Sequence, residues 1–252
     1  MITLARIDLA SERSRDARLV GSDVAALARV RHLSQVPHTV VLSAPLDLWL
    51  AVARAQPDRC RRRMLPGPFA RVSLRCAGVT DAGRVMVRSP VLHNLPISTL
   101  AEGSLELLAW TQRAAGGGRD IRAVLSVQHF LPARASVLVS VDPATGQQRM
   151  RACWGMAEPL SGPVYFDEVT VSEAAGVGTY TVARKETASA PAAGGTCTVV
   201  VPDELRDAPV LTLAVATRVA DTARTVGNHL GSVELEFVFV DDEAHLVRCE
   251  HR

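Results

Sequence analysis

Lysine is almost missing from this chain: its 252 residues include 28 basic side chains, and Lys185 is the only lysine among them. The sequence has no Walker motif, whose phosphate-binding loop requires a lysine, and no G-x-S-x-G elbow or Rossmann glycine fingerprint. Phosphate-loop NTPases, α/β-hydrolases and dinucleotide-binding enzymes are therefore classes that the sequence does not indicate.

Cysteine and histidine are present, but not in metal-binding patterns. The cysteines are odd in number and widely spaced, without a C-x-x-C pair, which argues against a zinc site or a disulfide framework. We expect most of them to be small core residues, as free cysteine usually is. The seven histidines show no H-x-x-x-H or other ligand spacing. The cysteines are Cys60, Cys76, Cys153, Cys197 and Cys249.

Long apolar runs and strong charge of one sign are also missing. No apolar stretch reaches the length of a bilayer span, and the first residues hold no apolar segment like that of a signal peptide. The formal net charge of +2 is too small to indicate nucleic acid or a membrane as partner. We therefore expect a soluble cytoplasmic protein. With 48% hydrophobic residues, the chain can bury a sizeable core, in one large domain or in two lobes around a cleft.

The periodicity of apolar residues predicts a mixture of helices and strands, the α+β class. A run of glycines at 116–118 predicts the boundary between an N-terminal lobe, 1–118, and a C-terminal lobe, 119–252. Basic and small-residue stretches at 59–68 and 188–195 predict loops. Helices are predicted over 20–33, 45–55, 99–114 and 209–227, and strands over 39–44, 71–79, 84–90, 121–131, 135–142, 146–155, 180–186, 232–240 and 244–250.

The last predicted hairpin carries carboxylates that point to chemistry. Glu234 and Glu236 have the same parity in their strand and share one face, and Glu250 lies on the next strand. Carboxylates on adjacent antiparallel strands can share a magnesium ion, which takes oxygen ligands from protein and phosphate together. The alternative is a solvated sheet face, where charged residues are common.

The same hairpin, GSVELEFVFVDDEAHLVRCEHR (231–252), resembles the end of the ATP-grasp domain in the phosphoenolpyruvate synthase, pyruvate phosphate dikinase and rifampin phosphotransferase family. The pattern there is roughly D-I-E-W-A, a turn, then L-Y-L-L-Q-T-R-P. Other segments resemble family motifs in the same order along the chain. They are LVGSDVAAL (19–27) for V-G-G-K-G-A-N-L, VMVRSP (85–90) for V-A-V-R-S-S, NLPISTLAEGSLELL (94–108) for the phosphate-covering loop, SVQHFLPARASVLVSVDPATG (126–146) for V-Q-x-M-V and T-x-D-P-x-T-G, and CWGMAEPLSGPVYFDEVTV (153–171) for G-L-G-E-x-V-V-S-G.

This resemblance implies an ATP-grasp-like fold with two lobes around a nucleotide cleft, and ATP and Mg²⁺ as ligands. Glu236 falls on the family's metal-binding Glu, and Glu250 on a metal-binding Gln. Arg88 and Arg252 fall on arginines that contact the phosphates, and they are the predicted catalytic residues. We expect Arg88 and Glu236 to line one cleft.

Three further nucleotide contacts follow from the resemblance, each with a structural alternative. Gly103 lies in the phosphate-covering loop, or else interrupts a helix. Gln128 falls on the Gln of V-Q-x-M-V, or is a half-buried strand residue. Lys185 lies where the family has a Lys-Glu pair, or is a surface lysine beside Glu186.

The chain also departs from the family pattern. Asp23 falls on the lysine of G-G-K-G, and Leu107 falls on the loop threonine. An acidic side chain within ~4 Å of phosphate repels it by about 4 kcal/mol at an effective dielectric near 20. We therefore expect the shortened first lobe to displace Asp23 from the phosphate-binding groups.

Two functions are compatible with this pattern. The first is an ATP- and Mg²⁺-dependent phosphotransferase or ligase acting on a small molecule. No phosphohistidine domain follows Arg252 in this sequence, so the acceptor is expected to be a small molecule directly, or a separate phosphohistidine or acceptor-domain protein. The second is a catalytically degenerate homologue that serves as a binding or assembly partner.

Overall fold

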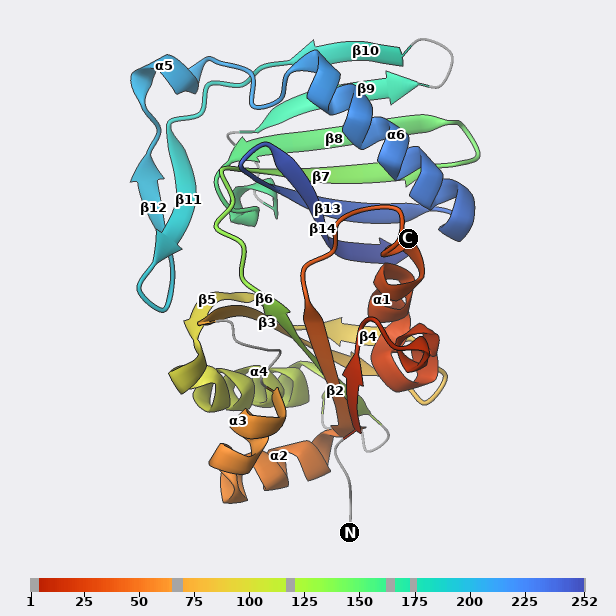
Figure 1. Ribbon diagram of the computed structural model, residues 1–252, viewed down its shortest axis with the longest axis vertical. Coiled ribbons are helices and arrows are strands. Elements are labelled where there is room, and N and C mark those ends of the chain that lie inside the picture. The colour runs from red at the N-terminus through yellow and green to blue at the C-terminus, as the bar shows by residue number, and fades with distance from the viewer. Residues whose placement is uncertain (1–4, 65–69, 117–120, 162–165, 173–175, 252) are drawn as a thin grey trace. The chain divides into compact units, whose positions relative to one another are not determined.

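A computed structural model describes residues 5–64, 70–116, 121–161, 166–172 and 176–251 (Figure 1). Helices and strands are mixed along the chain, which confirms the α+β class. The chain forms two compact units. Unit 1 comprises Met1–Arg29, Pro37–Phe130 and Ala192–Gly195, and unit 2 comprises Val30–Val36, Leu131–Pro191 and Thr196–Arg252. The predicted boundary at 118/119 lies outside the described residues, and unit 1 continues beyond it to Phe130.

Unit 1 is built on an antiparallel sheet in the order β1-β2-β6-β3-β4, with β5 paired to β3. Alternating side chains of its strands point to opposite faces, so that Val40 and Leu42 join one apolar cluster while Val41 joins another. The sheet therefore buries both of its faces. Its strands are β1 (Ala5–Asp8), β2 (Thr39–Pro45), β3 (Arg71–Val79), β4 (Val85–Arg88), β5 (Leu92–Pro96) and β6 (Arg122–His129).

Helices cover both faces of this sheet. The α2 and α4 face holds Trp49 and Leu107 in its core, and the α1 face holds Val20. Gly21 interrupts α1 with φ 76°, a left-handed conformation, and a Cβ there would meet Val79 at 2.9 Å. The helices are α1 (Ala17–Val30), α2 (Leu46–Ala55), α3 (Pro57–Met64) and α4 (Leu100–Ala114), with 3-10 turns at Glu12–Arg15 and Ile97–Thr99.

The basic segment predicted as a loop over 59–68 is wrong in its first half, because α3 runs from Pro57 to Met64. Proline is favourable at the first position of a helix, where its missing N–H costs no hydrogen bond. Met64 is fully buried at the other end and accepts a hydrogen bond from the Ser104 hydroxyl at 3.1 Å. Residues 65–68 lie outside the described residues.

Unit 2 is built on a second antiparallel sheet, in the order β10-β9-β8-β7-β13-β14. Helix α6 lies across one face of this sheet (Figure 1). Gln35 forms a parallel bridge with His245 at the β14 edge. The elements are β7 (Ala135–Asp142), β8 (Gln147–Trp154), a 3-10 turn at Glu158–Ser161, β9 (Asp167–Ser172), β10 (Gly176–Thr181), α5 (Asp203–Arg206), α6 (Leu213–Leu230), β13 (Val233–Val240) and β14 (Glu243–His251).

One irregularity in unit 2 positions charged residues. Glu236 pairs with Arg248 and Phe237 with Leu246, so Val247 is an extra residue opposite the step between them. This β-bulge lets Leu246 remain with Phe237 on the apolar face while Arg248 joins Glu236 on the other face.

Two predictions for the middle of unit 2 are wrong. The strand predicted over 180–186 ends at Thr181, because the chain then turns and the backbone N–H of Lys185 bonds the Arg206 carbonyl at 2.9 Å. Most of the segment predicted as a loop over 188–195 lies in a two-stranded sheet, β11 (Thr187–Ala192) with β12 (Gly195–Val200). Small residues still pair as strands because the ladder is made by backbone groups.

Among the described residues, no helix is both long and apolar enough to span a membrane. Cys76, Cys153 and Cys249 are buried, as expected, whereas Cys197 is exposed. Burial raises the pKa of the Cys76 thiol to about 12, so it remains protonated and behaves as a core side chain.

Candidate functional site

The two faces of the unit 2 sheet differ in chemistry. Toward α6, the strands point apolar side chains such as Val139, Met150 and Phe237, all of them buried. On the opposite face of the sheet, the same strands carry arginines and glutamates at paired positions of β9 and β8 and of β13 and β14. We call this the charged face; it includes Arg149, Arg151, Glu168, Glu234, Glu236, Arg248 and Glu250.

A compact ionic cluster occupies the β13–β14 end of the charged face. Glu234 pairs with Glu250, and Glu236 with Arg248, so all four side chains share one side of the hairpin. Arg248 donates from Nε to Glu236 Oε2 at 2.8 Å and from Nη1 to Glu250 Oε1 at 2.8 Å. Its Nη2 lies 3.5 Å from Glu234 Oε1. We call this set the glutamate–arginine cluster.

The cluster is largely shielded from solvent. The side chain of Glu236 is 9% exposed, those of Glu234 and Glu250 are 15% exposed, and that of Arg248 is 26% exposed. Burial lowers the pKa of Arg248, but the charges of Glu236, Glu250 and Glu234 outweigh this effect and raise it above its ordinary value. Arg248 therefore stays a cation and is the common counter-charge of the three carboxylates.

The predicted metal ligands are thus brought together, as Glu236 and Glu250 both contact one guanidinium. Carboxylate oxygens suit Mg²⁺, which proteins commonly hold by one or two carboxylates while phosphate and water supply the rest. Among the described residues, no group of three or more His, Cys, Asp or Glu side chains is arranged to hold a metal ion by itself. Glu236 and Glu250 would supply two of the oxygen ligands of such an ion, and water or phosphate would supply the others.

Arg248 is a site residue that sequence reasoning missed. In the family pattern L-Y-L-L-Q, aligning Glu250 with the Gln places Arg248 on a leucine. A cation at an apolar position, two residues from a predicted ligand, is the signal that identifies it. Arg252, predicted as a phosphate contact, lies outside the described residues.

Lys185 is fully buried, so the alternative of a surface lysine is wrong. Its Nζ donates to Asp167 Oδ1 and to the Ala183 carbonyl, each at 2.6 Å, and the Asp167 side chain is also fully buried. Asp167 accepts further bonds from the backbone N–H groups of Ala183 at 3.0 Å and Val210 at 2.7 Å. This buried network ties β9 to the chain after β10 and before α6.

Tyr180 completes that network. Its hydroxyl lies 3.0 Å from the Leu211 carbonyl and 3.3 Å from Asp167 Oδ2, and it accepts from the Leu211 N–H at 3.1 Å. Burial, reinforced by the charge of Asp167, raises the pKa of Tyr180 to about 12. The phenol is therefore a neutral partner throughout the physiological range.

In unit 1, Arg88 ends β4 and forms a two-pronged ion pair with Asp23 of α1. The Nε–Oδ2 distance is 2.7 Å and the Nη2–Oδ1 distance is 3.1 Å. The side chains are 44% and 18% exposed. Our expectation that Asp23 lies away from the phosphate-binding groups is wrong with respect to Arg88. The carboxylate of Asp23 occupies one edge of the guanidinium, which the sequence comparison predicts as a phosphate contact.

The two remaining predicted contacts are packed in unit 1. Gly103 lies within α4, where an added Cβ would meet Leu95 at 3.0 Å and Leu92 at 3.3 Å. Gln128 lies on β6, is buried, and donates to the Thr39 hydroxyl at 3.1 Å. Their roles toward a nucleotide stay predictions.

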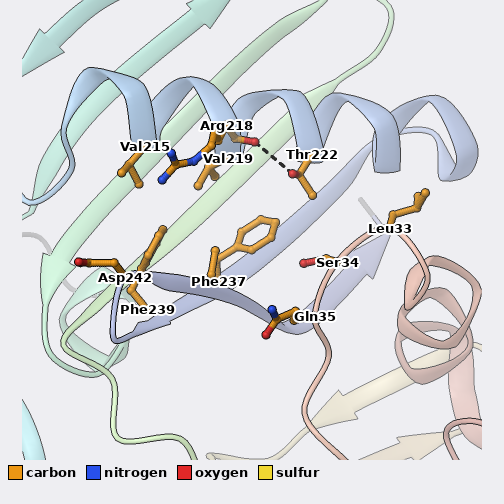
Figure 2. Close-up of a pocket in the computed structure, with 11 residues that line it drawn as sticks. Leu33, Ser34, Gln35, Val215, Arg218, Val219, Thr222, Phe237, Phe239 and Asp242 are labelled. Carbon is orange, nitrogen blue, oxygen red and sulfur yellow. Dashed lines mark hydrogen bonds between the residues drawn. The ribbon is translucent and has the colours of Figure 1, made fainter.

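A pocket in unit 2 lies on the other side of the sheet from the glutamate–arginine cluster. Figure 2 shows α6 side chains above the phenyl rings of β13, with the segment 33–35 at one end. Its volume is about 250 Å³, below the roughly 300–1,000 Å³ of typical ligand sites. Because Phe237 and Glu236 alternate along β13, this pocket is not part of the predicted metal site. The lining includes Val215, Arg218, Val219, Thr222, Phe237 and Phe239.

Comparisons with known proteins give limited matches. No protein-family model matches the chain. It is similar to rifampicin phosphotransferase of Streptomyces sviceus, with 29% identity over 136 residues; the match takes in 52% of this chain and only 16% of that enzyme.

Among solved structures, D-alanine–D-alanine ligase of Bacillus anthracis has a TM-score of 0.37 at 10% identity, covering 89% of this chain and 53% of the ligase. The ATP-grasp ligase PsnB, complexed with a minimal precursor, has a TM-score of 0.33 at 12% identity, covering 96% of this chain and 55% of PsnB. This chain therefore spans about half the length of these ligases, and TM-scores of this size do not assign a fold.

Proposed function

We propose that this chain binds ATP together with Mg²⁺ in an ATP-grasp-like manner and acts as a phosphotransferase or ligase on a small molecule. The observation that carries the proposal is the glutamate–arginine cluster, where Glu236 and Glu250 converge on one side of the β13–β14 hairpin. The ordered motifs along the chain and the partial match to a rifampicin phosphotransferase support it.

In this proposal, each predicted site residue has a defined task. Glu236 and Glu250 hold the metal through carboxylate oxygens, and bound Mg²⁺ supplies positive charge that neutralises the phosphates. Arg88 and Arg252 orient the phosphates and stabilise the charge that develops during transfer. Phosphoryl transfer needs mainly such positioning and charge neutralisation, so no covalent residue is required. The acceptor is a small molecule, or a separate phosphohistidine or acceptor-domain protein.

A second candidate function is that of a degenerate homologue that no longer turns over nucleotide. The observation that favours it is the Asp23–Arg88 pair, because Asp23 already neutralises the arginine predicted to bind phosphate. For a nucleotide to use Arg88, its phosphates must displace this carboxylate. The burial of Lys185 against Asp167 adds a second predicted contact that is already engaged.

The proposal is tested by comparing Glu236→Gln with Glu234→Gln. We expect Glu236→Gln to weaken Mg²⁺-dependent ATP binding at least tenfold more than Glu234→Gln, because an amide cannot replace the charge of a carboxylate ligand at a divalent ion. Binding is measured by calorimetry with ATP and MgCl₂, and by thermal shift. ATP at ~100 times its dissociation constant should add about 2.7 kcal/mol to the free energy of unfolding of the wild type.

Glu234→Gln is the matched control, since Glu234 lies on the same strand and also contacts Arg248. Equal binding curves for the two variants would show that Glu236 is not the metal ligand. A wild-type chain that shows neither heat of binding nor thermal shift with ATP and MgCl₂ would favour the degenerate homologue.

A further inference from the structure

Arg248 forms an ion pair with each of the three carboxylates of the cluster. Its Nε donates a hydrogen bond to one oxygen of Glu236, and its Nη1 donates to one oxygen of Glu250. These two glutamates are the predicted metal ligands. A guanidinium presents its donors in a fixed planar fork, so these bonds also fix the positions of the two carboxylates.

The physical need for a cation here is clear from the geometry. Three carboxylates lie on one side of a two-stranded hairpin, and their side chains are no more than 15% exposed. Like charges brought together in a poorly solvated place repel one another, so removing their shared counter-charge is costly. A divalent metal ion would meet the same need, and two cations close together would repel each other.

We propose that Arg248 is an internal cation that competes with a divalent metal ion for Glu236 and Glu250, and so sets the metal affinity of this site. Arg248 is a positioning residue: it keeps the carboxylates paired when no metal is bound, and it must give way, at least in part, when one binds. The inference rests on the proposed function in taking Glu236 and Glu250 as ligands of Mg²⁺.

The test uses the full chain without nucleotide and compares Arg248→Met with the wild type. We expect Arg248→Met to bind Mn²⁺, followed by electron paramagnetic resonance, and Mg²⁺, followed by calorimetry, at least tenfold more tightly. In EDTA the variant should melt at a lower temperature than the wild type, and MgCl₂ should restore a larger part of its melting temperature than it adds to the wild type.

Arg134→Met is the matched control. Arg134 is also in unit 2, but it is 65% exposed and pairs with one carboxylate, Asp242, at 3.3 Å. We expect this variant to keep the metal affinity and the metal response of the wild type. Arg248→Lys, which keeps a cation but loses the fork, should gain less metal affinity than Arg248→Met and provides a second measurement if the methionine variant does not fold.

Two outcomes would overturn the inference. The first is that neither Arg248 variant that folds binds Mn²⁺ or Mg²⁺ more tightly than the wild type. The second is a loss of melting temperature that MgCl₂ does not restore, since that describes a purely structural arginine. Failure here is distinct from failure of the proposed function, which is decided by ATP binding to the wild type.

Discussion

Two ion pairs of this molecule have almost the same length and opposite surroundings. Lys185 and Asp167 of unit 2 are 2.6 Å apart with neither side chain exposed, whereas Arg88 and Asp23 of unit 1 are 2.7 Å apart with side chains 44% and 18% exposed. The sequence marks Lys185 and Arg88 alike as nucleotide contacts. Their environments differ: the Lys185–Asp167 pair is enclosed in the fold, whereas the Arg88–Asp23 pair is partly exposed to solvent.

The hydrogen bonds explain why the buried pair is structural. Asp167 accepts from Lys185 and from two backbone N–H groups, and Lys185 also donates to a backbone carbonyl. Both charged groups therefore have hydrogen-bond partners within the protein and need none from a ligand. Asp23, in contrast, accepts from the Arg88 guanidinium and from the Ser22 hydroxyl, and the Arg88 side chain is 44% exposed.

The largest expected effect tests the buried pair. Lys185→Met should lower the free energy of unfolding by about 3–5 kcal/mol, because it leaves Asp167 charged and buried without its cation. Urea denaturation measures this loss. Arg184→Met is the control, since Arg184 is the neighbouring residue but pairs at the surface, and its midpoint should stay close to that of the wild type. A Lys185→Met protein of unchanged stability would break the comparison, because a lysine kept only for ligand binding would behave in that way.

The second prediction concerns the exposed pair. Asp23→Asn should change the free energy of unfolding by no more than about 1 kcal/mol, as is usual for exposed pairs. It should also raise the affinity for ATP with MgCl₂ at least tenfold, because the carboxylate that competes with phosphate for Arg88 is then a neutral amide. Calorimetry measures the affinity, with Asp47→Asn on α2 as a surface control. If the affinity does not rise, Arg88 is not a phosphate contact.

The smallest expected effect sharpens the description of the buried network. Tyr180→Phe should cost about 1 kcal/mol near pH 8, the usual net value of one hydrogen bond. The pKa of Tyr180 rises from 10.0 to about 12 on folding, so the neutral phenol's stabilising effect is complete below pH 10 and is lost as the pH rises toward 12. The stability advantage of wild type over Tyr180→Phe, followed by urea denaturation from pH 8 to 12, should therefore shrink. A constant difference would show that the phenol does not titrate in this range.

Much of the fold follows from local patterns. Alternating or continuous apolar residues correctly predict strands such as 71–79, 135–142 and 232–240, because one or both faces of these strands are buried. The helix predicted over 45–55 is correct to within one residue, since α2 begins at Leu46 and buries its apolar side chains. The sheet of β11 and β12 was missed because its residues are small or exposed, and its pairing depends on backbone groups that leave no side-chain pattern.

The candidate site was only partly predictable. Strand parity places Glu234 and Glu236 on one face, and the structure confirms that Glu250 joins them. Neither parity nor motif spacing shows that Arg248 also holds Glu236 and Glu234, or that Asp23 pairs with Arg88, because these pairs join residues 12 or more positions apart in the sequence. The surface alternative for Lys185 takes the adjacent Glu186 as its neighbour, whereas the actual partner, Asp167, lies 18 residues away in the sequence.

The bulge at Val247 has a consequence for how related chains can differ in length. Deletion of the Val247 codon would straighten β14 and leave Leu246 opposite Phe237 and Arg248 opposite Glu236. Deletion of the Cys249 codon would instead shift Glu250 by one position and turn its carboxylate toward the apolar face. A relative one residue shorter in this hairpin should therefore lack the counterpart of Val247.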